Sequence, residues 1–281
     1  MASYQPIMIV TGANSGMGLA TTIALAKQGC RVIMACRSPE RGEQALQEAI
    51  KQSSSQDIEL MRCDLASLES IHKFAATFQA KYTQLDALIN NAGVFALKRQ
   101  MTEDGFEMQL GVNHLGHFLL TELLLVSLIR ARQGRIVVVS SGAHKVGSIY
   151  WEDPFFTKGY SFWKGYAQSK LANILFTKEL ARRLPGTRVT VNCVHPGAVG
   201  TSLGVDRNTG FGKSVLALLS LFFLTPEEGM QTALYLATSE DVQGISGEYF
   251  YKKRIAPVSA KAKDVELARK LWIWSEQQVS S

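Results

Sequence analysis

Cysteine is scarce in this sequence, and its cysteines form no CxxC pair. Most of them lie in or beside apolar runs. The full set is Cys30, Cys36, Cys63 and Cys193. This usage argues against a disulfide framework and against a cysteine zinc site, and it predicts reduced, buried thiols of a cytosolic type.

Long hydrophobic runs are also lacking. The longest apolar stretch, residues 215–224, is about half of the roughly 20 residues that a membrane-spanning helix needs. It could form a core helix, a pocket lid or an interfacial helix. The first strand is expected by about Ile7, which leaves no room for a signal peptide or an amino-terminal anchor. We therefore expect no transmembrane segment and a cytoplasmic location, with peripheral membrane contact left open.

Charge of one sign is not concentrated anywhere. The 281 residues include 30 Lys and Arg against 24 Asp and Glu, a net charge of +6, and the basic residues are scattered apart from short clusters such as Lys252-Lys253-Arg254. Scattered charge is typical of a solvated surface, so we expect no nucleic-acid partner. A basic balance still suits a multiply phosphorylated small ligand. The 46% hydrophobic content argues against disorder.

Segments typical of strands and of helices alternate along the whole chain. Strands are expected at residues 7–11, 31–35, 58–63, 86–90, 135–140, 188–194 and 248–251. Helices are expected at residues 19–28, 41–51, 68–82, 106–132 and 164–184 and after Thr225. This alternation predicts an α/β fold, a Rossmann-type doubly wound three-layer sandwich with a mainly parallel sheet of about seven strands. We expect one domain over residues 1–281, with substrate loops at about 142–165 and 202–225.

A glycine-rich turn follows the first expected strand. It reads Thr11-Gly12-Ala13-Asn14-Ser15-Gly16-Met17-Gly18, so its glycines follow the spacing Gly-xxx-Gly-x-Gly. Glycines there allow a tight turn and close approach of the backbone to a pyrophosphate, and the following helix offers free N–H groups to the phosphates. The alternative is a glycine turn that binds nothing.

The end of the second expected strand bears on cofactor choice. A carboxylate at this point would bind the ribose hydroxyls of NAD, but the sequence there is Ala35-Cys36-Arg37-Ser38. The planar guanidinium of Arg37 matches a 2′-phosphate instead. We therefore expect NADP(H) in preference to NAD(H), although Arg37 could be an ordinary surface arginine.

Tyr166 and Lys170 are four residues apart in a segment expected to be helical. Such residues share a helix face, so the ammonium group can lie beside the phenol. A nearby positive charge lowers a tyrosine pKa, which makes Tyr166 a candidate proton donor and acceptor. An isolated pair with this spacing is more often a surface helix pair.

These motifs, taken in order, resemble those of the short-chain dehydrogenase/reductase superfamily over nearly the whole chain. The further matching segments are Asp64-Leu65, Asn90-Asn91-Ala92-Gly93, Asn113, Ser140-Ser141 and Pro196-Gly197-Ala198-Val199-Gly200-Thr201. A narrower resemblance, to the retinol dehydrogenase branch, is carried by residues 32–37, 113–120 and 225–229 and by the 25-residue separation of Ser141 from Tyr166.

The resemblance implies a role for each matching residue. Tyr166 would be the general acid or base, Lys170 would lower its pKa and hold the nicotinamide ribose, Ser141 would hold the substrate oxygen, and Asn113 would anchor a water. Cofactor contacts are implied for Gly12, Asn14, Ser15, Gly16, Met17, Gly18, Arg37, Asp64, Leu65, Asn91, Ala92, Gly93, Pro196, Gly197, Val199 and Thr201, besides Tyr166 and Lys170. Asp64 could instead be a loop-capping carboxylate, and Asn91 a strand-end turn residue.

Several alternatives stay open. Light-dependent protochlorophyllide reductases share some of these motifs, and a protein that senses NADP(H) without turnover is a third possibility. His114 and His117 lack an evident third ligand, so we expect no metal, and His144 is expected to be a solvated loop histidine. The aromatic residues between positions 150 and 163 could line an apolar cleft or pack as a structural flap.

The substrate and the oligomer follow from the same reasoning. An aromatic insertion and residues 211–224 fall where this superfamily places its substrate loops, so we expect a small apolar carbonyl or alcohol. The resemblance also implies a homodimer or homotetramer, with leucines 119, 120, 123 and 124 suitably spaced for helix pairing. Burial against the chain's own sheet would explain these leucines equally well.

Overall fold

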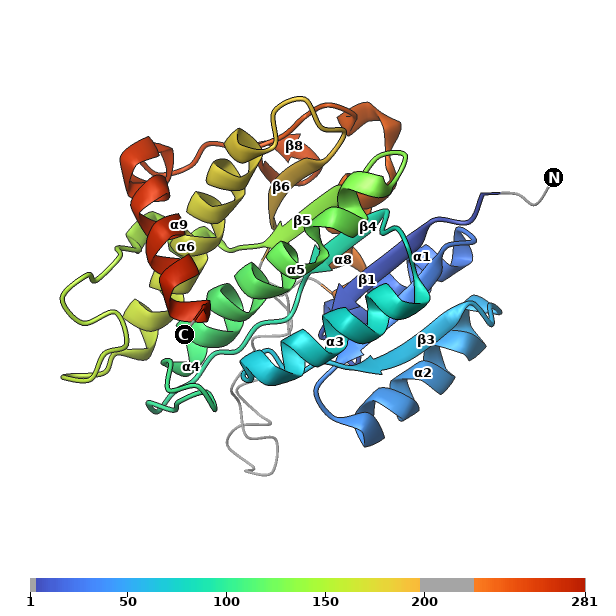
Figure 1. Ribbon diagram of the computed structural model, residues 1–281, viewed down its shortest axis with the longest axis horizontal. Helices are drawn as coiled ribbons and strands as arrows, with labels where there is room; N and C mark the ends of the chain where they lie inside the picture. Colours follow the sequence, from blue (N-terminus) through green and yellow to red (C-terminus); the bar gives the residue numbers. More distant parts are fainter. Residues whose placement is uncertain (1–3, 198–224, 281) are drawn as a thin grey trace.

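A computed structural model describes residues 4–197 and 225–280 of the chain. It contains an eight-stranded sheet with the strand order β3-β2-β1-β4-β5-β6-β7-β8 (Figure 1). The strands are β1 Ile7–Thr11, β2 Arg31–Cys36, β3 Ile58–Arg62, β4 Ala87–Asn90, β5 Arg135–Val139, β6 Thr190–His195, β7 Tyr249–Tyr251 and β8 Arg254–Ile255. All pairings are parallel except that of β7 with β8. The chain order reverses between β1 and β4, which is where open α/β sheets bind ligands.

Helices cover both faces of the sheet, which confirms the predicted three-layer, doubly wound fold (Figure 1). Helices α1, α2 and α8 lie on one face, α3, α5 and α6 lie on the other, and α9 packs outside α5 and α6. The longer helices are α1 Gly16–Lys27, α2 Pro39–Ser53, α3 Leu68–Lys81, α5 Gly116–Arg130, α6 Phe162–Arg183, α8 Pro226–Thr238 and α9 Val265–Val279. The short ones are α4 Met108–Leu110, η1 Gly111–Leu115, η2 Gly142–Val146, η3 Glu240–Val242 and η4 Lys261–Lys263.

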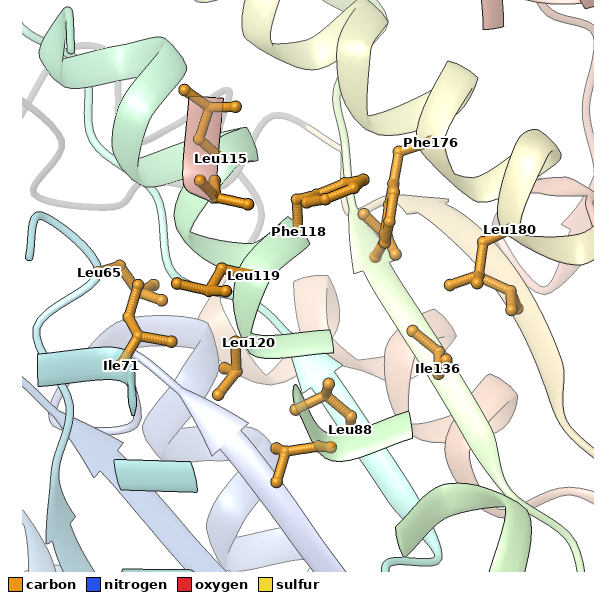
Figure 2. Packing of buried hydrophobic residues seen from close by; sticks show 14 of the residues in the cluster. Leu65, Ile71, Leu88, Leu115, Phe118, Leu119, Leu120, Ile136, Phe176 and Leu180 are labelled. Carbon is orange, nitrogen blue, oxygen red and sulfur yellow. The ribbon is translucent and has the colours of Figure 1, made fainter. Parts of the chain in front are cut away.

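The sheet divides the core into two hydrophobic clusters because side chains alternate along each strand. In β1, Ile9 belongs to the cluster under α3, α5 and α6, while Met8 and Val10 belong to the one under α1 and α8. Figure 2 shows the first cluster, in which Leu119 of α5 lies beside Leu65 and Ile71 while Phe118 faces Phe176 of α6. Leu119, Leu120 and Leu124 are buried there. The chain's own core therefore accounts for these leucines.

The four cysteines are free and buried, as predicted. Burial raises the pKa of the Cys30 and Cys36 thiols to about 11 and that of Cys63 to about 12. Thiolate is the reactive form of cysteine, so these side chains are inert hydrophobic groups at neutral pH.

Two elements at the carboxyl-terminal end were not predicted. β8 pairs antiparallel with β7 across Lys252 and Lys253, whose φ angles are +50° and +61°. Lys-Lys is not a sequence signal for a tight turn, whereas Gly or Asn at these positions would have predicted one. Helix α9 begins at its N-cap Asp264, whose side chain accepts a hydrogen bond from Leu267 N at 3.0 Å. The sheet therefore has eight strands where about seven were expected.

One helix is long and apolar enough to cross a membrane, so the expectation that the chain has no transmembrane segment is wrong as judged by helix length and composition. The continuous helix Met108–Arg130 has 23 residues and an apolar window with mean hydropathy of 1.5. This helix contains no long unbroken apolar run, because polar side chains such as Asn113, His117 and Thr121 interrupt it. Within the fold, 72% of that window is buried. A cytoplasmic location stays a prediction.

Candidate active site

The predicted site residues gather along one edge of the sheet. Thr11, Asn90, Val139 and His195 end the strands β1, β4, β5 and β6. Because these strands are parallel, the segments that follow them meet at their common carboxyl edge. The glycine loop, the segment after Asn90, the Ser141 turn and the segment after His195 therefore share one location.

Tyr166 and Lys170 lie one turn apart on α6, as predicted. The helix begins after its N-cap Ser161, whose side chain accepts a hydrogen bond from Lys164 N. Lys170 Nζ lies 5.5 Å from the centroid of the Tyr166 ring. The lysine is only 4% exposed, and its Nζ donates to Val139 O at 3.2 Å. A hydrogen bond from Ser140 Oγ to Lys170 O at 2.7 Å fixes this part of α6 against β5.

Burial controls the titration of both groups. It lowers the pKa of Lys170 to about 8. It also raises the pKa of Tyr166, against the opposing effect of a hydrogen bond with Ser141. The sequence predicted a tyrosine pKa lowered by the lysine, and in this structure the direction is upward. The physical reason is desolvation of the phenolate, which here outweighs stabilisation by neighbouring groups.

Ser141 lies in the turn that connects β5 to η2. Its Oγ accepts a hydrogen bond from Ala143 N at 3.2 Å while the side chain also meets the Tyr166 hydroxyl. The carbonyl of Ser141 lies 2.8 Å from His144 Nδ1. On the other side of the ring, Ser259 N donates to His144 Nε2 at 3.4 Å. This pair of contacts requires a neutral His144 with its proton on Nδ1.

His144 was expected to be a solvated loop histidine, and that expectation is wrong. Its side chain is fully buried, and burial lowers its pKa. The ring packs against Tyr249 of β7 at a centroid distance of 5.0 Å. Three sequence positions from Ser141, it connects the turn that bears this serine to the segment before α9.

Asn113 lies in the π-helical turn η1 and is fully buried. Its Oδ1 accepts a hydrogen bond from Val94 N at 2.7 Å, and its Nδ2 donates to Val94 O at 3.1 Å and to Ser169 Oγ at 3.0 Å. The amide therefore ties the segment after β4 to helix α6. The predicted anchoring of a water by this residue stays a prediction.

His114 and His117 point to different partners. His117 Nε2 lies 2.9 Å from Thr11 Oγ1 and its Nδ1 lies 3.2 Å from Asn113 O, whereas His114 Nε2 lies 2.9 Å from Ser275 Oγ in α9. Among residues 4–197 and 225–280, no three His, Cys, Asp or Glu side chains are grouped to hold a metal ion.

The glycine loop is packed too closely for side chains at two positions. Gly12 has φ of +63°, and a Cβ there would lie 3.0 Å from Ala92 Cα. A Cβ on Gly18 would lie 2.3 Å from Gly12 O and 2.6 Å from Asn91 Nδ2. Asn91 Nδ2 donates to Thr11 O at 2.7 Å, so Asn91 holds the loop from the β4 side.

The start of α1 fits the phosphates of a dinucleotide. Its N-cap Ser15 is exposed and makes no side-chain capping bond. The first N–H groups of a helix have no partner inside the helix, and an anion can satisfy them. Asn14 and Gly16 beside it are half-buried, whereas Met17 is buried. These loop residues can line such a ligand as predicted, although only their placement is observed.

Two predicted cofactor positions follow β2 and β3. Arg37 comes directly after β2 and is exposed. Asp64 follows β3 and its Oδ1 accepts a hydrogen bond from Ala66 N at 3.0 Å, which is the loop-capping alternative. Leu65 beside it is buried. Arg41, which sequence reasoning missed, lies in the first turn of α2, close enough to Cys36 for its charge to oppose in part the rise in thiol pKa that burial causes. Its position three residues after the N-cap Ser38 was the available signal.

The segments after β4 and β6 complete the edge. Asn91, Ala92 and Gly93 are half-buried, and a Cβ on Gly93 would lie 3.7 Å from Lys170 Nζ. Pro196 and Gly197 follow β6, and Gly197 has φ of +89°. The predicted contacts Val199 and Thr201, and nearly all of the 202–225 loop, lie outside the described residues.

Phe95 is an aromatic residue of this site that sequence reasoning missed. Its ring centroid lies 5.1 Å from that of Tyr166 and 5.4 Å from those of Phe162 and Trp163. The available signal was its position two residues after the Asn-Asn-Ala-Gly motif.

Other aromatics of the insertion pack as a flap, since Trp151 and Phe155 contact Trp274 of α9. Phe162 and Trp163 of the insertion instead pack on Phe95, whose ring contacts Tyr166.

Comparison with known proteins gives the class. The family model described as short chain dehydrogenase matches residues 6–210. The chain therefore belongs to the short chain dehydrogenase family, a class of oxidoreductases whose fold binds a nicotinamide cofactor.

Individual relatives place it more narrowly. The chain is 47% identical to human retinol dehydrogenase 14, over 97% of this chain and 85% of that protein. It is similar in structure to an uncharacterized protein from Mycobacterium paratuberculosis, with a TM-score of 0.79, 36% identity and coverage of 99% and 94% of the two chains. A short chain dehydrogenase from Shigella flexneri complexed with NADP has a TM-score of 0.69 and 25% identity, with 87% and 95% covered. The chain is thus retinol dehydrogenase-like, which confirms the resemblance.

Proposed function

We propose that this protein is an NADP(H)-dependent oxidoreductase that interconverts an apolar carbonyl compound and its alcohol. The observation that carries the proposal is the joint placement of Ser141, Tyr166 and Lys170. The Ser141 hydroxyl forms a hydrogen bond with the phenol, and the buried Lys170 ammonium lies 5.5 Å from the centroid of the same ring. A substrate oxygen beside Ser141 and Tyr166 would face both a hydrogen-bond donor and a proton donor.

Tyr166 acts in this proposal as general acid in reduction and as general base in oxidation. A neutral phenol, favoured by burial, suits the donation of a proton to a carbonyl oxygen. Ser141 holds that oxygen. Lys170 is held by Val139 O, and its charge stabilises the phenolate left after proton transfer. Asn113 fixes the backbone of Val94 against α6, which holds the segment after β4 in place beside Tyr166 and Lys170.

The residues at the sheet edge fit a dinucleotide. The close-packed glycine loop and the uncapped start of α1 suit a pyrophosphate. Arg37 is exposed after β2, where a 2′-phosphate would lie, and Arg41 lies in the first turn of the following helix α2. When bound, the nicotinamide supplies the hydride. The solved relative that carries NADP supports this choice.

An apolar substrate is supported by two observations. Phe95 packs on Tyr166, Phe162 and Trp163, and Trp163 is 60% exposed, so apolar surface extends outward from the proton donor. The curated relative is named for retinol, a long apolar alcohol. We infer that the substrate lies along these rings with its oxygen at Tyr166.

The test is a set of initial rates with NADPH and with NADH on short aliphatic aldehydes, retinal, steroid ketones and quinones. Tyr166→Phe removes the proton donor and keeps the ring. We expect NADPH-dependent turnover that falls by roughly 10²- to 10⁴-fold in this variant. Binding of NADPH, measured by its fluorescence, should be retained.

The outcomes separate the alternatives. Turnover that survives in Tyr166→Phe would overturn the assignment of the proton donor. Activity that appears only under illumination with a bound pigment would favour the tetrapyrrole alternative. Tight NADPH binding without turnover of any carbonyl would favour a sensing protein.

A further inference from the structure

Two adjoining hollows open at the amino-terminal edge of the sheet, opposite the active-site edge. One is lined by residues that precede parallel strands, Gln133 before β5, Arg188 before β6 and Gly244 before β7, and the other includes Ser246 and Gly247 before β7. Their volumes are about 330 Å³ and about 300 Å³, and they share Ala181 and Ser246. A ligand bound there would not touch the residues of the proposed reaction.

The charged side chains that line these hollows have one sign. Lys178, Arg182 and Lys263 line the first, and Arg132 and Arg188 line the second. No Asp or Glu among the described residues lines either one. We call this surface the basic hollow. Like charges gathered in one concavity focus a positive potential and attract anions.

Some of these cations already have partners. Arg182 pairs with Glu179 at 2.7 Å, and the Arg132 guanidinium lies 4.0 Å from the centroid of the Tyr4 ring. Lys178 and Lys263 take part in none of the ion pairs found within residues 4–197 and 225–280. The first hollow is therefore lined by two lysines that form no ion pair with a described residue.

Hydrogen-bond donors remain available at the same place. Lys178 is half-buried, and its Nζ donates one hydrogen bond to Gly247 O at 3.0 Å, which leaves two N–H groups. Ser246 Oγ accepts from Val191 N at 3.0 Å and keeps its own hydrogen to donate. Lys263 is exposed at the rim. Two ammonium groups and a hydroxyl around one hollow can donate hydrogen bonds to the three terminal oxygen atoms of a phosphate monoester.

We propose that the basic hollow binds a phosphate-bearing ligand through Lys178, Ser246 and Lys263. The phosphate belongs either to a soluble phosphorylated molecule or to the headgroup of an anionic phospholipid. Binding is independent of the reaction proposed above, because the site lies at the other edge of the sheet.

The experiment uses the full chain and inorganic phosphate as the first probe. Thermal unfolding is measured with rising phosphate while chloride keeps the ionic strength constant. The test variant is Lys178→Gln with Lys263→Gln. The matched control is Lys51→Gln with Lys158→Gln, which removes two exposed charges elsewhere. The variant Lys178→Arg keeps the charge at the hollow.

We expect phosphate to stabilise the wild type, the control pair and Lys178→Arg. Phosphate also fits the dinucleotide loop, so the decisive quantity is the difference between proteins. In the test variant, the phosphate concentration needed for half of the stabilisation should rise at least roughly tenfold. This is the effect expected for the loss of a charged hydrogen bond. Equal stabilisation of the test variant and the control pair would overturn the proposal.

A second probe distinguishes the two sources of phosphate. Wild type and variants are sedimented with vesicles of phosphatidylcholine alone and with added phosphatidic acid. Binding to the acidic vesicles that is lost only in the test variant would identify a lipid headgroup. A phosphate response without vesicle binding would identify a soluble ligand. Vesicle binding that is equal in all variants, with no difference in the phosphate response, would exclude the basic hollow as a site.

Discussion

Lys170 Nζ lies 5.5 Å from the centroid of the Tyr166 ring, while its hydrogen bond goes to Val139 O at 3.2 Å. The lysine is therefore a buried cation fixed by strand β5, unlike the exposed lysine of an ordinary surface pair. Because burial lowers its pKa to about 8, its charge changes just above neutral pH. The pair can thus be examined through its proton as well as through turnover.

The first prediction concerns stability against pH. The folded protein binds the Lys170 proton more weakly than the unfolded chain, in which lysine has its ordinary pKa of 10.5. Below about pH 8 both states are protonated and the folded state carries the full cost of burial, roughly 3 kcal/mol. Between pH 8 and 10.5 the unfolded state binds more protons, so this cost falls as pH rises.

Lys170→Met removes the titrating group and keeps a long side chain. Urea unfolding of both proteins across this interval gives their difference in the free energy of unfolding, in which the other groups cancel. We expect the variant to gain relative to the wild type below pH 8 and to lose that advantage toward pH 10.5. A difference that does not change with pH would show that Lys170 is not desolvated in the folded protein.

The second prediction concerns cofactor choice. Arg37→Ala removes the guanidinium that follows β2, so the KM for NADPH should rise by roughly 10- to 100-fold, the effect of losing one charged hydrogen bond. The KM for NADH should change little, because NADH lacks the 2′-phosphate. Arg41→Ala tests the neighbouring arginine in the same way. Arg130→Ala, at the far end of α5, is the control for general loss of charge.

Equal weakening of both cofactors in Arg37→Ala would mean that this arginine does not read the phosphate. Loss of NADPH selectivity in Arg41→Ala alone would transfer the role to the first turn of α2.

Much of the fold could be predicted because buried parallel strands and their helices leave strong patterns. Helix α8 is an example: a helix was expected after Thr225, and in the structure Thr225 and Glu228 form a capping box with Pro226 in the first turn. Helix α9 was missed even though its buried residues Ala268, Leu271 and Ser275 follow helical spacing. It packs mainly on α6 and also contacts α5 and η1. This helix is therefore stabilised by packing against distant segments, and local sequence patterns do not reveal such contacts.

The site shows the same division. The motif residues were placed by local pattern, and the structure brings Ser141, Tyr166 and Lys170 together. The upward shift of the Tyr166 pKa could not be predicted, because desolvation depends on everything packed around the ring. The burial of His144 likewise depends on Ser259, more than a hundred residues away along the chain. Local motifs name the groups, and tertiary packing sets their protonation.

The third prediction concerns Asn113. Its side chain makes hydrogen bonds to both backbone groups of Val94 and to Ser169 Oγ. Asn113→Ala leaves these partners without it, at a cost of about 1–3 kcal/mol for each buried group that stays unpaired. We expect a lower free energy of unfolding, measured by urea titration, together with lost turnover.

Ser169→Ala is the comparison for Asn113→Ala: it removes one of these three hydrogen bonds together with the bond from Ser169 Oγ to Tyr166 O, and it should cost less because both bonds to Val94 remain. Lost turnover in Asn113→Ala without loss of stability would contradict the tethering role and point to a direct part in catalysis.

The last prediction concerns the rings beside Tyr166. Trp163 is 60% exposed, so Trp163→Ala should change the free energy of unfolding by only a few tenths of a kcal/mol to about 1 kcal/mol. If the exposed ring supports a long apolar substrate, the KM for retinal should rise several-fold, while the KM for a short aldehyde stays unchanged. Trp163→Phe should restore most of the affinity for retinal.

Phe95→Ala removes a ring that contacts Tyr166, Phe162 and Trp163, and this variant should behave differently. Tyr166 then loses an edge-to-face partner, an effect of about 0.5–1.5 kcal/mol for each aromatic pair. Because a loosened proton donor affects every substrate, kcat should fall for short and long aldehydes alike. A pattern in which Phe95→Ala spares the short aldehyde would mean that this ring contacts substrate and does not position Tyr166.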